Sequence, residues 1–213
     1  MKRAILLLLS IGLLAGCSAV SGSTQTANVG MSDVSADLAV FEGNETYDVL
    51  AVTPVEYTLT GSETYDTFFE NAAVVYASVV TADGLIGVAE TQLGAIATRL
   101  ELAGSDDLAE LANQLIETGE LSAEDTAIIN DVQTAANALV SSLEAVPGNG
   151  QTLVGQIPDL VSNAPSEFAT SPGTLSSVQE SLDTAQSNLA SAIEQAPDLA
   201  ANLAGLAESL SGL

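Results

Sequence analysis

The sequence predicts an all-α fold: an elongated antiparallel helical bundle, or coiled coil, of three long legs, preceded by a short extended segment. Apolar residues recur at alternating steps of three and four along residues 63–103, 108–146 and 175–213, which is the heptad pattern of packed helices. The legs have similar lengths, as neighbouring helices need if they are to end at the same levels of a bundle. We therefore expect residues 63–213 to form the bundle.

The chain begins with the pattern of an export signal. Lys2 and Arg3 give it a positive start, and an apolar run from Ala4 to Ala15 follows. This run is shorter than the roughly 20 residues that a membrane-spanning helix needs, so we expect it to direct export rather than to anchor the chain permanently. Residues 1–16 are therefore interpreted as a signal peptide.

The only cysteine of the chain, Cys17, ends this signal in the sequence Leu14-Ala15-Gly16-Cys17. The motif resembles the lipobox of bacterial lipoproteins, in which a Leu and two small residues precede a cysteine. The resemblance implies cleavage between Gly16 and Cys17, diacylglycerol on the Cys17 thiol, and usually a third acyl chain on its amine. Each buried CH₂ contributes about 0.8 kcal/mol, so two or three chains would make a durable membrane anchor.

Ser18 follows the cysteine. In lipoproteins of two-membrane bacteria, an Asp at this position usually means that the protein is not released to the outer membrane. Ser18 therefore resembles the residue of a lipoprotein that is released to the outer membrane. The resemblance thus implies an exported protein, lipid-anchored to a bacterial membrane and sorted to the outer one. The alternative is an ordinary secretory signal with a chance cysteine. A disulfide within the chain is excluded, because Cys17 has no second cysteine to pair with.

Composition excludes most catalytic and binding chemistry. The chain has no His and no Trp, and removal of Lys2 and Arg3 would leave Arg99 as the only base. The chain therefore lacks the residues for histidine-dependent catalysis and for ordinary zinc or copper sites. A single Arg cannot form the positively charged surface that binds nucleic acid. We expect no enzyme activity, no cofactor and no metal site; a carboxylate enzyme would need two buried acids that face one cleft.

Acidic residues outnumber basic ones by 28 to three. Such a chain repels itself in fresh water, whereas at about 1 M salt the Debye length of about 3 Å screens the repulsion, so the composition is typical of a saline habitat. Clustered carboxylates could instead bind Ca²⁺, but the sequence has no EF-hand-type loop. The acidic pairs in GSDDLAE and SAEDTA fall where helices should begin, and there they complement the helix dipole.

Two short regions separate the signal from the bundle. Residues 17–37 are small and polar without a period, and they predict a flexible tether that starts at the lipidated Cys17. Residues 38–62 predict a short extended segment on the helical body, because Val55, Tyr57 and Leu59 alternate with polar residues.

The first leg is predicted as a helix over residues 63–103. Gly87 and Gly94 flank its seam and lower helix propensity, so we expect mobility near residues 84–94. The seam consists of Phe68, Ala72, Val75, Val79, Ala82, Ile86, Ala89, Leu93, Ile96, Leu100 and Ala103.

The second leg begins behind the caps Ser105 and Asp106, breaks at TGELS, and restarts behind Ser122. Residues 147–173 hold PGNGQ and three further prolines, so we predict an irregular connection there. The seam of this leg consists of Leu108, Leu111, Leu115, Ile129, Val132, Ala136, Leu139, Leu143 and Val146.

The third leg runs to the end of the chain. Pro197 interrupts it, and we expect a kink or a break there that leaves the seam in phase. The seam consists of Leu175, Val178, Leu182, Ala185, Leu189, Ala192, Ala196, Leu199, Leu203, Leu206, Leu210 and Leu213.

Together these features predict a membrane-anchored helical lipoprotein that acts as a non-enzymatic scaffold, spacer or protein-interaction module in the cell envelope. Its partners would be the membrane, through lipid on Cys17, and a protein or a second copy of itself, through the helical faces. The alternative is a carrier or sensor of apolar ligands or lipids in the bundle interior. The two differ in whether the bundle encloses an apolar cavity of several hundred Å³.

Overall fold

A computed structural model describes residues 23–27, 55–105 and 107–212. Within these ranges the chain forms two short strands, β1 (Thr24–Ala27) and β2 (Val55–Thr58), and four helices. The helices are α2 (Glu63–Arg99), α3 (Leu108–Thr118), α4 (Ala123–Glu167) and α5 (Pro172–Leu210). The predicted signal peptide, its cleavage site at Gly16 and Cys17, and most of the predicted tether lie outside the described residues.

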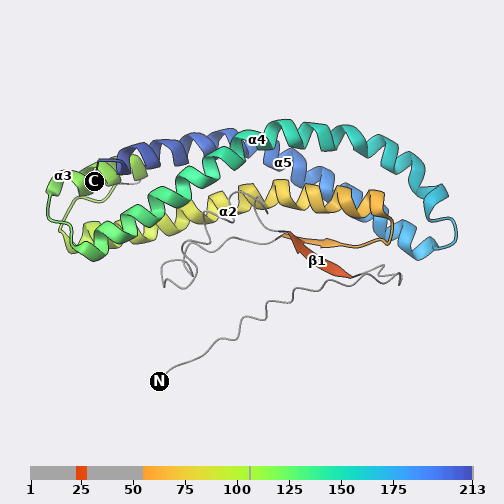
Figure 1. The fold of residues 1–213 in the computed structure, drawn as a ribbon, viewed down its shortest axis with the longest axis horizontal. Helices are drawn as coiled ribbons and strands as arrows, with labels where there is room; N and C mark the ends of the chain where they lie inside the picture. The colour runs from red at the N-terminus through yellow and green to blue at the C-terminus, as the bar shows by residue number, and fades with distance from the viewer. Residues whose placement is uncertain (1–22, 28–54, 106, 213) are drawn as a thin grey trace, which may run out of the picture.

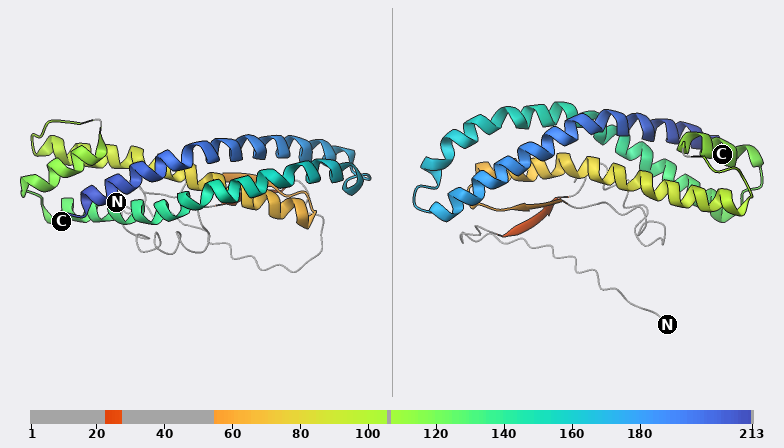
Figure 2. Two further views of the ribbon diagram at one scale, coloured as in Figure 1. Left: turned by 90° about the horizontal axis from the view of Figure 1, so that it is seen from above. Right: turned by 180° about the vertical axis from the view of Figure 1, so that it is seen from behind.

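The three long helices α2, α4 and α5 lie side by side in an elongated bundle (Figures 1 and 2). Helix α4 runs antiparallel to the other two, and α3 packs against α2 and α5 at the end where α2 finishes (Figure 1). The long helices have 37, 45 and 39 residues, so their lengths are similar, although the middle helix has other bounds than the predicted second leg. The predicted all-α antiparallel bundle is therefore confirmed.

The predicted seams form the core. In α2 the seam residues are buried, except for the half-buried Ile86 and Leu100; Ala103 lies beyond the helix and is exposed. In α5 the seam keeps its phase across Pro197, as expected, and the helix continues through that proline without a break. The buried seam residues of α5 are Val178, Leu182, Ala185, Leu189, Ala192, Ala196, Leu203, Leu206 and Leu210.

The prediction of an irregular connection over residues 147–173 is wrong, because α4 continues as one helix to Glu167. Its seam extends past Val146 in steps of four and three through buried Gly150, Leu153, Ile157, Leu160 and Ala164. The prolines lie away from the seam: Pro158 and Pro165 are exposed and Pro147 is half-buried. A proline removes one backbone hydrogen bond, but on the solvent side the freed carbonyl can bind water, and the helix bends around the core instead of ending.

This correction changes the second leg. In place of one interrupted leg ending at Val146, the chain forms the short helix α3 and the long helix α4. The predicted break at TGELS is confirmed: Gly119 has a φ of +63°, a left-handed conformation that favours glycine, and it ends α3. The connection between α4 and α5 is only residues 168–171, so these two helices form a tight antiparallel pair.

The acidic pairs cap helices, as predicted, with one change of residue. Asp107, rather than Ser105 or Asp106, caps α3: its carboxylate accepts hydrogen bonds from the backbone N–H groups of Ala109 (2.9 Å) and Glu110 (3.3 Å). Ser122 caps α4 in a reciprocal box with Asp125. These side chains satisfy backbone donors that a helix start otherwise leaves unpaired.

Strands β1 and β2 pair antiparallel, with Gln25 opposite Tyr57, and the pair packs on α2 (Figure 1). The extended piece predicted around Val55 is thus confirmed, whereas the prediction of a flexible tether is wrong for β1, which falls within residues 17–37. The sequence TQTA is too short and polar to show a strand period. Its pairing partner lies about thirty residues later in the chain, where local pattern cannot detect it.

Among the described helices, α2 alone is long and apolar enough to cross a membrane by these two criteria. Its most apolar window has a mean hydropathy of 1.7, and 56% of that window is buried inside the bundle. A core helix that packs on two neighbouring helices can have the same length and apolar composition as a membrane-spanning helix. The contacts of α2 with α4 and α5 account for its apolar character.

Candidate functional site

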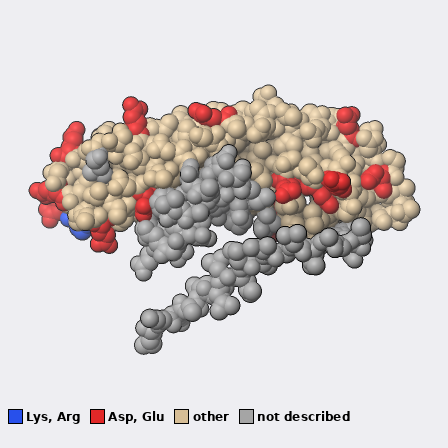
Figure 3. Space-filling model, in the orientation of Figure 1, with Lys and Arg blue, Asp and Glu red and all other residues tan. Residues whose placement is uncertain are grey.

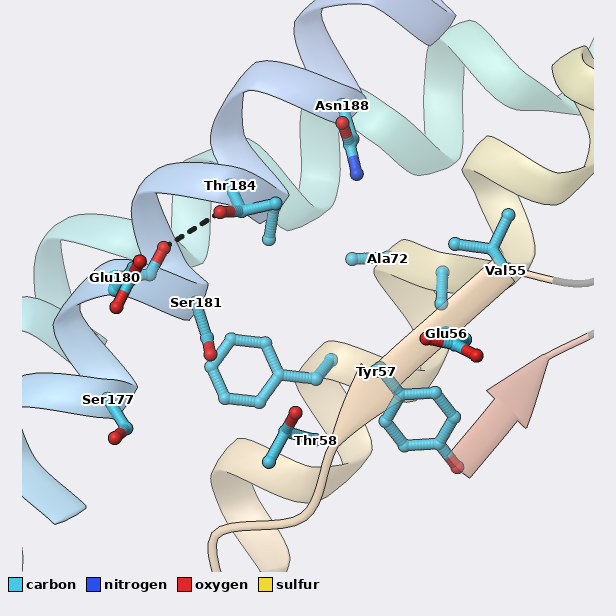
Figure 4. A pocket seen from close by; sticks show the side chains of 13 residues that line it. Val55, Glu56, Tyr57, Thr58, Ala72, Ser177, Glu180, Ser181, Thr184 and Asn188 are labelled. Carbon is cyan, nitrogen blue, oxygen red and sulfur yellow. Dashed lines mark hydrogen bonds between the residues drawn. The ribbon is translucent and has the colours of Figure 1, made fainter. Parts of the chain in front are cut away.

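A groove lies between β2, α2 and α5 (Figure 4). It has a volume of about 400 Å³. Phe69, Ala72 and Ala73 of α2 contribute its apolar part, and the backbone and side chains of β2 form one wall. The opposite wall is α5, and a ligand that entered from solvent would contact all three elements.

The α5 wall is a polar stripe, defined by Ser177, Ser181, Thr184 and Asn188. Steps of four, three and four place these side chains on one face of the helix, directly beside the buried seam. Figure 4 shows the stripe along the groove, with the Thr184 hydroxyl donating to the Glu180 carbonyl at 3.0 Å. The stripe therefore offers hydroxyl and amide groups next to an apolar floor.

A second hollow of about 210 Å³ continues the groove along β2. It shares Thr58, Ser177 and Ser181 with the first and extends to Thr60 and Thr174. Because they share these residues, the two hollows adjoin each other along the strand and the start of α5. We call the two adjoining hollows the β2–α5 groove.

The β2–α5 groove is acidic. Glu56 and Glu180 line it, and both are exposed. Burial raises the pKa of the Tyr57 hydroxyl above its ordinary value, and the negative charges of Glu70 and Asp66 raise that pKa further. Acidic side chains are spread along the face shown in Figure 3, whereas the only base among the described residues, Arg99, lies at one end of the bundle.

At that end, Arg99 forms an ion pair with Asp125. The Asp125 side chain is only 6% exposed, and its carboxylate also accepts hydrogen bonds from the hydroxyl and the backbone N–H of Ser122. Burial alone raises the pKa of this carboxyl, but the bonds from Ser122 and the positive charge of Arg99 outweigh burial and hold the pKa below its ordinary value. The arrangement ties the end of α2 to the start of α4.

This ion pair predicts an acid-sensitive contribution to stability. Because the folded pKa of Asp125 lies below its unfolded value, its stabilising effect is complete above the unfolded pKa and is lost as pH falls through the folded pKa. Asp125→Asn should therefore unfold at a lower temperature than the unchanged protein at pH 7, and the difference should shrink below about pH 4. Thermal unfolding from pH 7 to 2 in high salt measures this, and a difference that stayed constant over the range would contradict the assignment.

Asp125 is the one acidic residue that is buried among the described residues, and it is paired with a base. No group of three or more His, Cys, Asp or Glu side chains in the described ranges could hold a metal ion. The described carboxylates thus do not bring two buried acids to one cleft.

The site residues predicted from the sequence differ from those that line the groove in the structure. Cys17 and Gly16 lie outside the described residues, so lipidation and cleavage there stay predictions. The β2–α5 groove was missed by sequence reasoning, because its residues come from three elements far apart in the sequence. The helical spacing of the polar stripe on α5 indicates only that these four residues share one face of a helix. No protein-family model, curated protein or solved structure matches the chain.

Proposed function

We propose that the protein is a bacterial lipoprotein, held to the outer membrane by lipid on Cys17, whose helical bundle acts as a non-enzymatic scaffold, spacer or protein-interaction module of the cell envelope. The observation that carries the proposal is the sequence Leu14-Ala15-Gly16-Cys17 directly after a positively charged start and an apolar run. A signal of this kind gives the chain a point of attachment at its mature N-terminus.

The shape of the bundle supports a spacer or scaffold. A straight helix of the length of α4, 45 residues, spans roughly 65 Å. All three long helices contribute seam residues to one hydrophobic core, so the bundle forms one elongated unit with long side faces. A body of this form, attached by lipid at one end of its chain, can hold a bound partner at a distance from the membrane.

A carrier of apolar ligands is the second candidate, and it would need an apolar cavity inside the bundle. The seam positions at the bundle axis are occupied by fully buried side chains such as Leu93, Leu143 and Leu189. The β2–α5 groove opens to solvent and mixes acidic, hydroxyl and apolar groups. These observations favour an interaction module over a carrier.

Substitution of the cysteine tests the attachment. Cys17→Ser removes the only thiol that can receive diacylglycerol, so the variant should lose all incorporation of labelled fatty acid and leave the membrane fraction. Ser18→Ala is the matched control, because it changes the neighbouring side chain and keeps the thiol. It should remain labelled and membrane-bound.

Retention of Cys17→Ser in the membrane fraction after a wash in 1 M salt would refute the lipid anchor. Equal labelling of both variants would mean that the fatty acid is attached elsewhere, and it would refute the assignment to Cys17 as well. Fractionation and labelling are read on the same cultures, so the two outcomes are separated.

A further inference from the structure

We propose that the β2–α5 groove binds an extended, basic peptide segment of a partner protein, which adds as a strand to the free edge of β2. The inference rests on the proposed role as an interaction module, and it specifies the chemical nature of the partner segment as extended and basic. Three features carry it: a strand edge that pairs with no other described strand, the polar stripe opposite, and the acidic charge of the groove.

The hydrogen-bond pattern identifies the free edge. The Leu59 N–H donates at 2.9 Å to the carbonyl of Ser23, the residue just before β1, and Tyr57 lies opposite Gln25. In an antiparallel pair, backbone groups of alternate residues point to opposite edges. Residues 55, 57 and 59 therefore face β1, and Glu56 and Thr58 direct their N–H and C=O groups to the other edge.

That other edge has no strand partner among the described residues, because the sheet there contains only β1 and β2. Glu56 and Thr58 both line the groove, so the edge opens into it (Figure 4). An exposed strand edge is a template for main-chain pairing with an added strand. The groove volume of about 400 Å³ suits a segment of a few residues.

The opposite wall suits the outer edge of such a segment. An added strand has backbone N–H and C=O groups on both edges, and the second set would otherwise lose its water. The hydroxyls of Ser177 and Thr184 donate to the helix carbonyls of Gly173 and Glu180 and can still accept hydrogen bonds from N–H groups of the segment. The amide of Asn188 can both donate and accept. The helical spacing of these side chains provides partners along the length of the groove.

Charge selects the partner and disfavours self-pairing. Glu56 and Glu180 line the groove, and Glu70 and Asp66 act on the neighbouring Tyr57. A second copy that paired through the same edge would bring Glu56 near its own counterpart in a chain of formal net charge −25. A segment with Lys or Arg complements this charge, and the mature chain, with Arg99 as its only base, has no such basic segment.

The probe for the test is a capped octapeptide of alternating Lys and Thr, titrated into the full mature chain in detergent. Two comparison peptides isolate the features: one carries N-methyl groups on four consecutive central residues, which removes main-chain donors at unchanged charge, and one carries Glu in place of Lys. We expect the Lys peptide to bind, and each comparison peptide to bind more than about tenfold more weakly.

Variants of the protein locate the binding. Thr58→Pro removes a groove-facing N–H while Tyr57 and Leu59 keep the pairing with β1, and a proline is tolerated at such an edge. Glu56→Lys with Glu180→Lys reverses the charge at two exposed positions. Both changes should weaken the binding of the Lys peptide by more than about tenfold. Glu194→Lys with Glu208→Lys, at exposed α5 positions outside the groove, should change its affinity by less than about twofold.

Several results would overturn the proposal: no binding of the Lys peptide at millimolar concentration, equal binding of the N-methylated peptide, or equal affinity in the groove and control variants. A dimer of the unchanged protein that Thr58→Pro dissociates would replace the basic partner by a second copy. Circular dichroism verifies that each variant keeps its helix content. If the peptide binds as expected while Cys17→Ser stays in the membrane, the groove assignment stands and the lipid anchor fails.

Discussion

Tyr65→Ala should lower the free energy of unfolding by about 3–5 kcal/mol, the range for removal of a buried aromatic side chain. Tyr65 is 2% exposed and lies near the start of α2. Its hydroxyl donates to the backbone carbonyl of Leu160 at 2.7 Å, and its ring meets Phe168 edge-on at a centroid distance of 5.1 Å. The side chain thus joins the start of α2 to the end of α4, and its loss leaves a cavity between them.

Tyr65→Phe separates the ring from the hydroxyl. It keeps the contact with Phe168 and removes only the hydrogen bond, so it should cost about 0.5–1.5 kcal/mol. Urea unfolding followed by circular dichroism measures both variants under one condition. A similar loss for the two variants would show that the hydroxyl, rather than the packed ring, holds this end of the bundle.

Gly150→Leu should lower the free energy of unfolding by about 1–3 kcal/mol through overpacking. A Cβ at Gly150 would lie 2.7 Å from Cγ1 of Ile193 on α5, so a larger side chain there must displace Ile193, whereas Cγ1 of Val75 on α2 is at the ordinary contact distance of 4.0 Å. Combination with Ile193→Ala should restore part of the lost stability, because it removes the atoms that the new side chain meets.

Gly155→Leu is the matched control on the same helix. Gly155 is exposed, and a Cβ there would meet nothing within 4 Å. The change should therefore stabilise the protein by up to about 1 kcal/mol through helix propensity. Opposite signs at the two glycines would confirm that residues 147–167 are helical and packed; destabilisation of equal size at both positions would contradict this part of the fold.

The sequence predicted those parts of the fold that depend on short-range periodicity. The seams from Phe68 to Ile96 and from Val178 to Leu210 could be read because each residue's neighbour on the face lies three or four positions away. The capping residues of α3 and α4 were predicted for the same reason, with Ser122 correct for α4 and Asp107 in place of Ser105 and Asp106 for α3.

The prolines of α4 predict a break by composition alone, but they lie away from the buried face of the helix. Gly150, Leu153 and Ile157 continue the seam through the same residues, and burial of that seam outweighs the lost backbone bonds. The apolar periodicity that persists through Pro147 and Pro158 therefore indicates the structure of this segment better than its turn-like composition does.

The groove could not be predicted in the same way, because three elements far apart in the sequence form it. Thr58 and Ser181 are ordinary residues in their own segments, and only the packing of β2 on α2 beside α5 brings them to one groove. The strand β1, the only strand that pairs with β2 among residues 23–27, 55–105 and 107–212, was itself hidden in a polar stretch without a period. Long-range pairing therefore determines the site, while local pattern determines the bundle.

The mass of the mature N-terminal peptide tests the central claim most directly. The account predicts that the chain starts at Cys17 and that this residue carries the added mass of diacylglycerol, with or without a third acyl chain on its amine. Mass spectrometry of protein extracted from membranes would show both features in one fragment. A free thiol at Cys17, or a mature chain that starts elsewhere, would contradict the account.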